Sequence, residues 1–204
     1  AIAQGASERN ISAVINERDV KKALNTLHET FFEENTKQLN LFVMGVGNVG
    51  EKFIEQIHQQ KKYLKENLKI NLRVIALSNS RKMHFDEEGI SLKDWQSLVE
   101  NGEAASKEGF ISKVAALNLR NSIFVDITAN EEVSKTYEQY LKQNVAVVTC
   151  NKIACSSAYA NYKNLKNLSR QFKAPFLFET NVGAGLPIID TVKNLIASGD
   201  KVNK

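Results

Sequence analysis

The sequence contains few cysteines, few prolines and no long apolar run, and each shortage excludes a class of protein. Its 204 residues include two cysteines and two prolines. Cys150 and Cys155 are not spaced as C-x-x-C, and no histidine lies near them. They therefore supply too few ligands for zinc, and we expect free thiols in a reducing compartment. No stretch approaches the roughly 20 apolar residues that cross a bilayer, which excludes a membrane-spanning helix.

The N-terminus lacks a basic region followed by an apolar one, so the sequence predicts no signal peptide. Together with the reduced thiols, this absence predicts a cytoplasmic protein. The chain starts at Ala1 rather than at methionine, and its first residues already have the pattern of structured sequence. We therefore expect it to be part of a larger protein.

Charge of one sign is not concentrated anywhere along the chain. The net charge is +4, and no basic stripe is interleaved with aromatic residues. This pattern excludes nucleic acid as a partner. Hydrophobic residues make up 43% of the chain and charged residues 25%, which is typical of a soluble globular protein.

A glycine motif carries the first functional signal. Gly45, Gly47 and Gly50 have the spacing G-x-G-x-x-G, directly after the apolar run 39–44 and before a helical pattern. In a strand–turn–helix context, the first glycine permits a tight turn, the second lets backbone approach a pyrophosphate, and the third allows close helix packing. The helix N-terminus then offers unpaired N–H groups to the phosphates. The motif predicts a dinucleotide-binding site.

Strand and helix patterns alternate through residues 39–174, which predicts an α/β fold with a Rossmann-like open, mostly parallel sheet and helices on both faces. The strands are near-continuous apolar runs, as expected when both faces of a sheet are covered. The predicted strands are 39–44, 72–77, 122–127 and 145–149. Besides the helix after the glycines, the predicted helices are 94–101, 107–117, 131–143 and 157–172.

Two shorter segments flank this region. Residues 1–38 predict a strand at 11–15, an amphipathic helix over 20–31 and a polar linker, which is too little to bury a core alone. Residues 175–204 predict a short strand, a glycine-rich turn and a helix that begins after Pro187.

The end of the second predicted strand bears on which dinucleotide binds. Strict NAD sites usually place an acidic residue there to hold the ribose 2′-hydroxyl. This sequence has no acid between Leu77 and Lys82, but offers Ser80 and Arg81. These residues would accommodate a 2′-phosphate, which favours NADP, or a site that takes both cofactors, over NAD alone. An exposed turn with no binding role is the other interpretation.

Four motifs together resemble the bifunctional aspartokinase/homoserine dehydrogenases. Residues 3–12 resemble the end of the ACT regulatory region, and 45–50 fit the dehydrogenase's glycine fingerprint. Residues 148–152 and 179–187 resemble two homoserine dehydrogenase signatures, and the last of these is the most specific. The resemblance implies that residues 1–38 end the ACT domain and its linker. It also implies that 39–174 form the NAD(P)-binding domain and that 175–204 begin a truncated catalytic domain.

The implied reaction is the NAD(P)H-dependent interconversion of L-aspartate 4-semialdehyde and L-homoserine, on the route to threonine and methionine. The implied partners are the dinucleotide and, in the full-length protein, the small-molecule substrate and further copies of the chain. Arg81 would lie near a 2′-phosphate, Thr128 and Ala129 near the nicotinamide or its ribose, and Lys152 near phosphate, ribose or substrate. The implied cofactor-binding residues are Gly45, Val46, Gly47, Asn48, Val49, Gly50, Ser80, Arg81, Thr128, Ala129 and Lys152.

The resemblance also implies a monovalent-cation loop, usually for sodium. Its residues would be Glu179, Val182, Ala184 and Leu186. Two departures from the family matter. Cys150 stands where the family commonly has proline, and the chain ends before the acidic segment and lysine that carry catalysis. No residue can therefore be given the catalytic role, and we expect this chain to bind cofactor without turning over substrate.

Two other functions stay open at this point. A non-catalytic nucleotide-binding regulatory module would explain the α/β pattern, but it would not need the loop at 179–187. A different semialdehyde dehydrogenase, forming an acyl-enzyme, would need a reactive cysteine, and Cys150 is the candidate.

Overall fold

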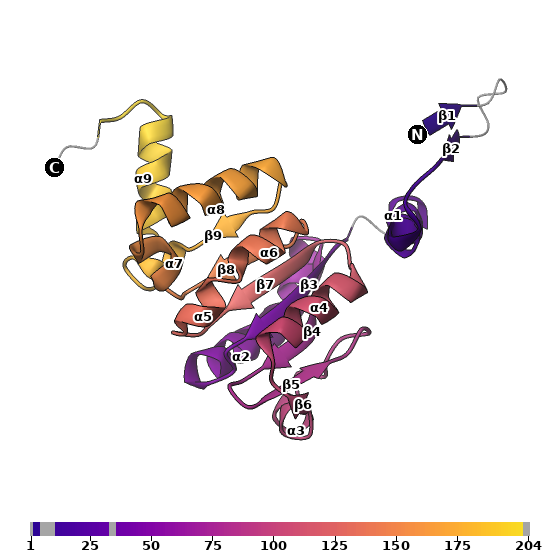
Figure 1. Ribbon diagram of the computed structural model, residues 1–204, viewed down its shortest axis with the longest axis horizontal. Coiled ribbons are helices and arrows are strands. Elements are labelled where there is room, and N and C mark those ends of the chain that lie inside the picture. The colour runs from indigo at the N-terminus through magenta and orange to yellow at the C-terminus, as the bar shows by residue number, and fades with distance from the viewer. Residues whose placement is uncertain (1, 5–10, 33–35, 202–204) are drawn as a thin grey trace.

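Seven strands form one open sheet in the part of the chain that the structure describes (Figure 1). The structure is a computed structural model and describes residues 2–4, 11–32 and 36–201. The strand order is β6-β5-β4-β3-β7-β8-β9, and neighbours from β4 to β9 run parallel, whereas β5 and β6 are antiparallel at one edge. This confirms the predicted α/β, mostly parallel, Rossmann-like sheet. The strands are β3 (Lys37–Met44), β4 (Ile70–Ser78), β5 (Lys82–Phe85), β6 (Glu103–Ala104), β7 (Ser122–Asp126), β8 (Ala146–Thr149) and β9 (Phe176–Leu177).

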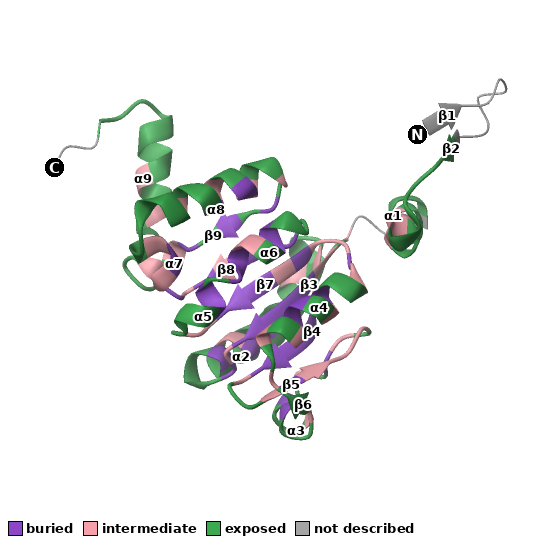
Figure 2. Cartoon of the chain, viewed as in Figure 1, coloured by how far each residue is buried: buried purple, intermediate pink, exposed green. Residues whose placement is uncertain are grey.

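Helices cover both faces of the sheet, and the central strands are buried between them (Figure 2). Successive residues of a strand point to opposite faces. Accordingly, Leu41 and Val43 of β3 pack with α2 and α3, and Phe42 and Met44 pack with α4, α6 and α8. The helices around the sheet are α2 (Asn48–Asn67), α3 (Trp95–Glu100), α4 (Lys107–Leu117), α5 (Glu131–Ser134), α6 (Tyr137–Lys142), α7 (Ile153–Ser156) and α8 (Tyr159–Gln171).

The chain connections create a switch point at the centre of the sheet. From β3 the chain passes through α2 to β4 on one side, and it later returns through α4 to β7 on the other side of β3. In an open α/β sheet, the crevice beyond the carboxyl ends of such strands is where ligands bind. The fold therefore places a candidate site at the ends of β3 and β7.

The N-terminal elements lie to one side of the sheet (Figure 1). They are β1 (Ile2–Gln4), β2 (Ile11–Ala13), η1 (Glu17–Asp19) and α1 (Val20–Phe32), with β1 and β2 paired antiparallel. Leu24, Leu27 and Phe31 of α1 are exposed. Asn118, at the end of α4, contacts this unit, since its Nδ2 donates to Asp19 Oδ1 at 3.0 Å. Most of the motif at 3–12, and 33–35 of the predicted linker, lie outside the described residues.

The C-terminal segment continues the same sheet, because β9 pairs with β8. It is followed by η2 (Glu179–Asn181) and α9 (Ile188–Ala197). None of the described helices combines the length and apolar character needed to cross a bilayer.

Several elements differ from the sequence predictions. The predicted helix 131–143 is two helices, because the Ser134 and Thr136 hydroxyls donate to carbonyls three residues back and compete with helix continuation. The helix predicted from 157 is preceded by the separate helix α7. The antiparallel strands β5 and β6 were not predicted.

Candidate functional site

A cleft of about 700 Å³ opens at the switch point. The glycine turn after β3, the ends of β4 and β7, and the start of α4 surround it. Its lining residues are Met44, Gly45, Val46, Gly47, Ser78, Asn79, Ser80, Ala105, Ser106, Lys107, Glu108, Ile127, Thr128, Asn130 and Val133. Of the predicted cofactor-binding residues, the fold thus brings Gly45, Val46, Gly47, Ser80 and Thr128 together around one cavity.

The three glycines of the motif have different structural environments. Gly45 has φ +106°, and a Cβ there would lie 2.5 Å from the Ile127 carbonyl oxygen. At Gly50, a Cβ would lie 2.3 Å from the Gly45 oxygen, whereas at Gly47 it would meet nothing within 4 Å. Gly45 and Gly50 are therefore required by backbone packing. Gly47 leaves open space at the cleft, which fits a ligand's close approach to the backbone.

The start of α2 supplies unpaired donors beside that space. Gly47 precedes the helix without a side-chain cap. Within the described part of the chain, no carbonyl accepts the N–H groups of Asn48 or Val49. Such groups, with the positive end of the helix dipole, attract anions. The Val46 N–H, by contrast, donates to the Ser78 oxygen at 3.2 Å, and the Gly45 N–H donates to the same oxygen at 2.8 Å.

The end of β4 forms a tight turn into β5. The Asn79 Oδ1 accepts the N–H groups of Arg81 and Lys82, both at 2.8 Å. This turn exposes Ser80 at the cleft and Arg81 beside it, although Arg81 is not among the lining residues. Two exposed polar side chains, one of them cationic, thus flank this end of the cleft.

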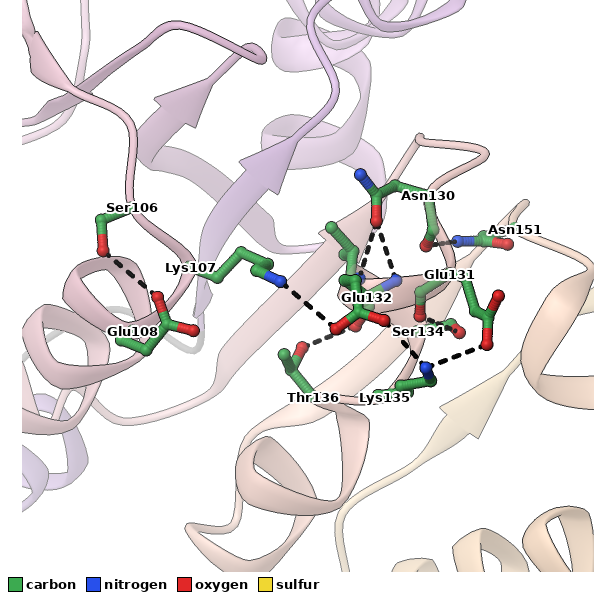
Figure 3. A network of polar contacts seen from close by, with 11 residues as sticks. Ser106, Lys107, Glu108, Asn130, Glu131, Glu132, Ser134, Lys135, Thr136 and Asn151 are labelled. Atoms are coloured by element: carbon green, nitrogen blue, oxygen red, sulfur yellow. Dashed lines mark hydrogen bonds and ion pairs between the residues drawn. The ribbon is translucent and has the colours of Figure 1, made fainter.

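Sequence reasoning missed part of the cleft wall, made by the start of α4 and by Asn130 before α5 (Figure 3). The Ser106 hydroxyl caps α4 by accepting the Gly109 N–H at 3.0 Å. Lys107 reaches across to Glu132 at 3.6 Å, and Asn130 caps α5 by accepting the Glu132 N–H at 2.8 Å. The capping residue Ser106 was a visible signal of the helix start, but its place at the cleft follows only from the crossover of α4.

At the other end of the cleft, loops after β7 and β8 meet. Asn151 is buried, and its Nδ2 donates to the Asn130 oxygen at 2.9 Å. The neighbouring Lys152 and Ala129 are exposed at this edge, and neither is a lining residue. Lys152 therefore lies close to the cleft without forming its wall.

The two cysteines are half-buried thiols. Burial raises the pKa of Cys150, and the nearby Asp126 carboxylate raises it further. Burial also raises the pKa of Cys155. A raised pKa lowers the thiolate fraction at neutral pH, which disfavours the acyl-enzyme alternative for Cys150.

Glu179, at the start of the predicted cation loop, is hydrogen-bonded to the first turn of helix α9, which follows the loop. Both carboxylate oxygens of Glu179 accept backbone N–H groups of α9, from Ile189 at 2.8 Å and Asp190 at 3.1 Å. Val182, Ala184 and Leu186 lie in the exposed turn between them. The described residues include no group of three or more histidine, cysteine or acidic side chains placed to hold a metal ion.

This fold, with its glycine turn, free helix N-terminus and switch-point cleft, defines a Rossmann-type dinucleotide-binding domain. The family profile described as "Homoserine dehydrogenase, NAD binding domain" matches residues 45–179, and an ACT domain profile matches residues 1–31. The chain belongs to the homoserine dehydrogenase NAD-binding family, next to the end of an ACT domain.

Curated relatives agree with this assignment. The chain is 41% identical to the bifunctional aspartokinase/homoserine dehydrogenase of Haemophilus influenzae, over 99% of this chain and 25% of that protein. The chloroplastic bifunctional enzyme 1 of Arabidopsis thaliana is 39% identical, over 99% of this chain and 22% of that protein. The chain thus spans about a quarter of the length of these relatives. The resemblance seen in the sequence is confirmed.

Solved structures agree with the fold. A Candida auris protein of unknown function is 27% identical, with a TM-score of 0.71 over 82% of this chain and 46% of that one. A mutant of a hyperthermophilic archaeal homoserine dehydrogenase in complex with NADPH is 24% identical, with a TM-score of 0.65 over 78% of this chain and 50% of that one.

Proposed function

We propose that this chain is the cofactor-binding part of an enzyme that interconverts L-aspartate 4-semialdehyde and L-homoserine, with NADPH as the preferred cofactor and NADH as the alternative. The observation that carries the proposal is the glycine turn, where open space at Gly47 adjoins the unpaired N–H groups of Asn48 and Val49. The nicotinamide cofactor supplies the hydride when bound.

The chain's own residues bind and orient the ligand. The free amides at the start of α2 hold the diphosphate, and the guanidinium of Arg81 with the hydroxyl of Ser80 receives a 2′-phosphate. Thr128 and Ala129 would adjoin the nicotinamide or its ribose. The ammonium of Lys152 faces the phosphate, ribose or substrate from the loop after β8. The remaining motif residues, Gly45, Val46 and Gly50, shape the turn.

Four finer parts of the proposal concern the whole protein. We propose that the three segments 1–38, 39–174 and 175–204 belong to the ACT end, the NAD(P)-binding domain and the start of the catalytic domain. No residue here takes the proton-donor role, so the chain alone binds cofactor without turnover, and full-length copies associate. We also propose a cytoplasmic location, although the plant relatives are named chloroplastic.

Sodium binding by Glu179, Val182, Ala184 and Leu186 stays a prediction. The Glu179 carboxylate already has two N–H partners, so carbonyl oxygens would have to supply most of the ligands. The regulatory-module alternative predicts nucleotide binding without any role for this loop.

Calorimetric titration with NADPH, comparing the unaltered chain with Gly47→Val, tests the proposal. The new side chain meets open space, so we expect the melting temperature to stay within about 2 °C while the Kd for NADPH rises at least tenfold, which corresponds to about 1.4 kcal/mol. Gly185→Val is the matched control, because a Cβ there also meets nothing within 4 Å, outside the cleft. Equal binding by all three proteins would overturn the proposed site.

A further inference from the structure

A buried polar cluster lies beneath the cleft at the carboxyl end of β7. Asp126 and Tyr137 are fully buried, and Thr149 and Asn151 are each 2% exposed. The Asp126 Oδ2 accepts the Tyr137 hydroxyl at 2.5 Å and the Asn151 Nδ2 at 3.1 Å, and its Oδ1 accepts the Thr128 N–H at 2.7 Å. No cation reaches this carboxylate in the described part of the chain. Its oxygens are satisfied by hydrogen-bond donors from Tyr137, Asn151 and the Thr128 N–H.

The hydrogen bonds in the cluster all donate toward the Asp126 carboxylate, from Asn151 through Thr149 and Tyr137. The Asn151 N–H donates to the Thr149 Oγ1 at 2.8 Å, and the Thr149 and Tyr137 hydroxyls lie 2.7 Å apart. Because the Tyr137 proton points at Asp126, the Thr149 proton points at Tyr137. Burial, with the charge of Asp126, raises the pKa of Tyr137 far above its usual range. The phenol therefore stays protonated, and a hydrogen-bond donor, at neutral pH.

These hydrogen bonds connect two loops that border the cleft. Asp126 holds the loop of Thr128 and Ala129 through the Thr128 N–H. The Asn151 Nδ2 also donates to Asp126 Oδ2, and it bridges to the Asn130 oxygen of the other loop (Figure 3 shows the Asn151–Asn130 contact). Lys152 follows Asn151 directly in the sequence. Among the described residues, no hydrogen bond links Ser80 or Arg81, at the proposed adenosine end of the cleft, to this cluster, and the Arg81 N–H donates to Asn79 Oδ1 instead. Any effect of the cluster should therefore be confined to one end of a bound dinucleotide.

We propose that Asp126, with Tyr137 and Thr149, positions the two loops that receive the nicotinamide half of the cofactor, so that these buried side chains act on binding through Thr128 and Asn151 without touching the ligand. The proposal rests on the proposed function, because it assigns the nicotinamide half to this end of the cleft. These three side chains are positioning residues. None is a catalytic residue.

The test separates the two halves of the cofactor. Binding of 2′,5′-ADP, which lacks the nicotinamide half, and of NADPH is measured by calorimetry on the unaltered chain, Tyr137→Phe, Thr149→Val and Thr149→Ser. The enhancement of dihydronicotinamide fluorescence gives a second readout at the nicotinamide end. Thr149→Ser is the conservative rescue, because it keeps the hydroxyl that Thr149→Val removes.

We expect Tyr137→Phe and Thr149→Val to raise the Kd for NADPH about five- to tenfold and to reduce its fluorescence enhancement, because each leaves buried donors or acceptors unpaired and loosens the loops. The Kd for 2′,5′-ADP should change less than twofold, and Thr149→Ser should bind like the unaltered chain. An equal rise in the Kd for NADPH and for 2′,5′-ADP, or no change in either Kd, would overturn the positioning role. Failure of the unaltered chain to bind 2′,5′-ADP or NADPH would instead contradict the proposed function.

Discussion

The residues of the glycine motif illustrate what a sequence pattern specifies and what it leaves open. Backbone atoms crowd Gly45 and Gly50, whereas Gly47 borders open space, in agreement with the separate roles that the spacing predicts. The pattern could not show that the Val46 N–H is already bonded to Ser78, because that bond comes from a strand 32 residues away. The glycine turn is therefore predictable from its own residues. Which of its N–H groups stay free depends on the neighbouring strand β4.

Arg81 provides a prediction at this scale about cofactor choice. In Arg81→Ala, the loss of an exposed cation beside a 2′-phosphate should raise the Kd for NADPH about three- to tenfold and leave NADH unchanged within twofold. Titrations with both cofactors measure this. Lys82→Ala is the matched control, because it removes the same charge one residue away, and the Lys82 Nζ is already engaged by the Gly102 oxygen at 3.0 Å. If Arg81→Ala raises the Kd for NADPH and for NADH equally, the guanidinium does not bind the 2′-phosphate.

Elements with a strong local signal were predicted well. Helix α4 begins and ends as predicted, at Lys107 and Leu117, with a serine cap at one end and Asn118 in the left-handed conformation at the other. The paired strands β5 and β6 are four and two residues long, too short for a periodic pattern to show. The break at Ser134–Thr136 was missed because it depends on side-chain hydroxyls that bond their own backbone.

The central strand β7 supports a prediction about stability. Phe124 is fully buried and stacks on Tyr140, with ring centroids 4.0 Å apart. Phe124→Ala should lower the free energy of unfolding by roughly 3–5 kcal/mol, since it removes buried area and leaves a cavity. Urea titration measures the loss. Tyr159→Ala is the control, because Tyr159 is 73% exposed. This substitution should lower the free energy of unfolding by less than about 0.5 kcal/mol. Similar losses in the two variants would contradict the core described for this face of the sheet.

For the whole molecule, topology decides which distant segments meet. The crossover through α4 carries residues 105–108 to the cleft, beside the turn at 45–47 and the loop at 127–130. Sequence periodicity predicts that α4 exists but not which strand it crosses, so this wall of the site could not be predicted. The N-terminal unit contacts the other end of the same helix at Asn118. The signatures at 45–50, 148–152 and 179–187 lie at the carboxyl ends of β3, β8 and β9 or just after them, so they meet at one edge of the sheet.

Amide chemical-shift mapping of the ¹⁵N-labelled chain tests the central claim, that the turn between β3 and α2 receives the cofactor diphosphate. On titration with NADPH, we predict the largest shifts at residues 47–50, with further shifts at 128–130 and 105–108. Saturable shifts confined to the opposite edge of the sheet, around Asn118 and Lys142, with the glycine turn unchanged, would contradict the account.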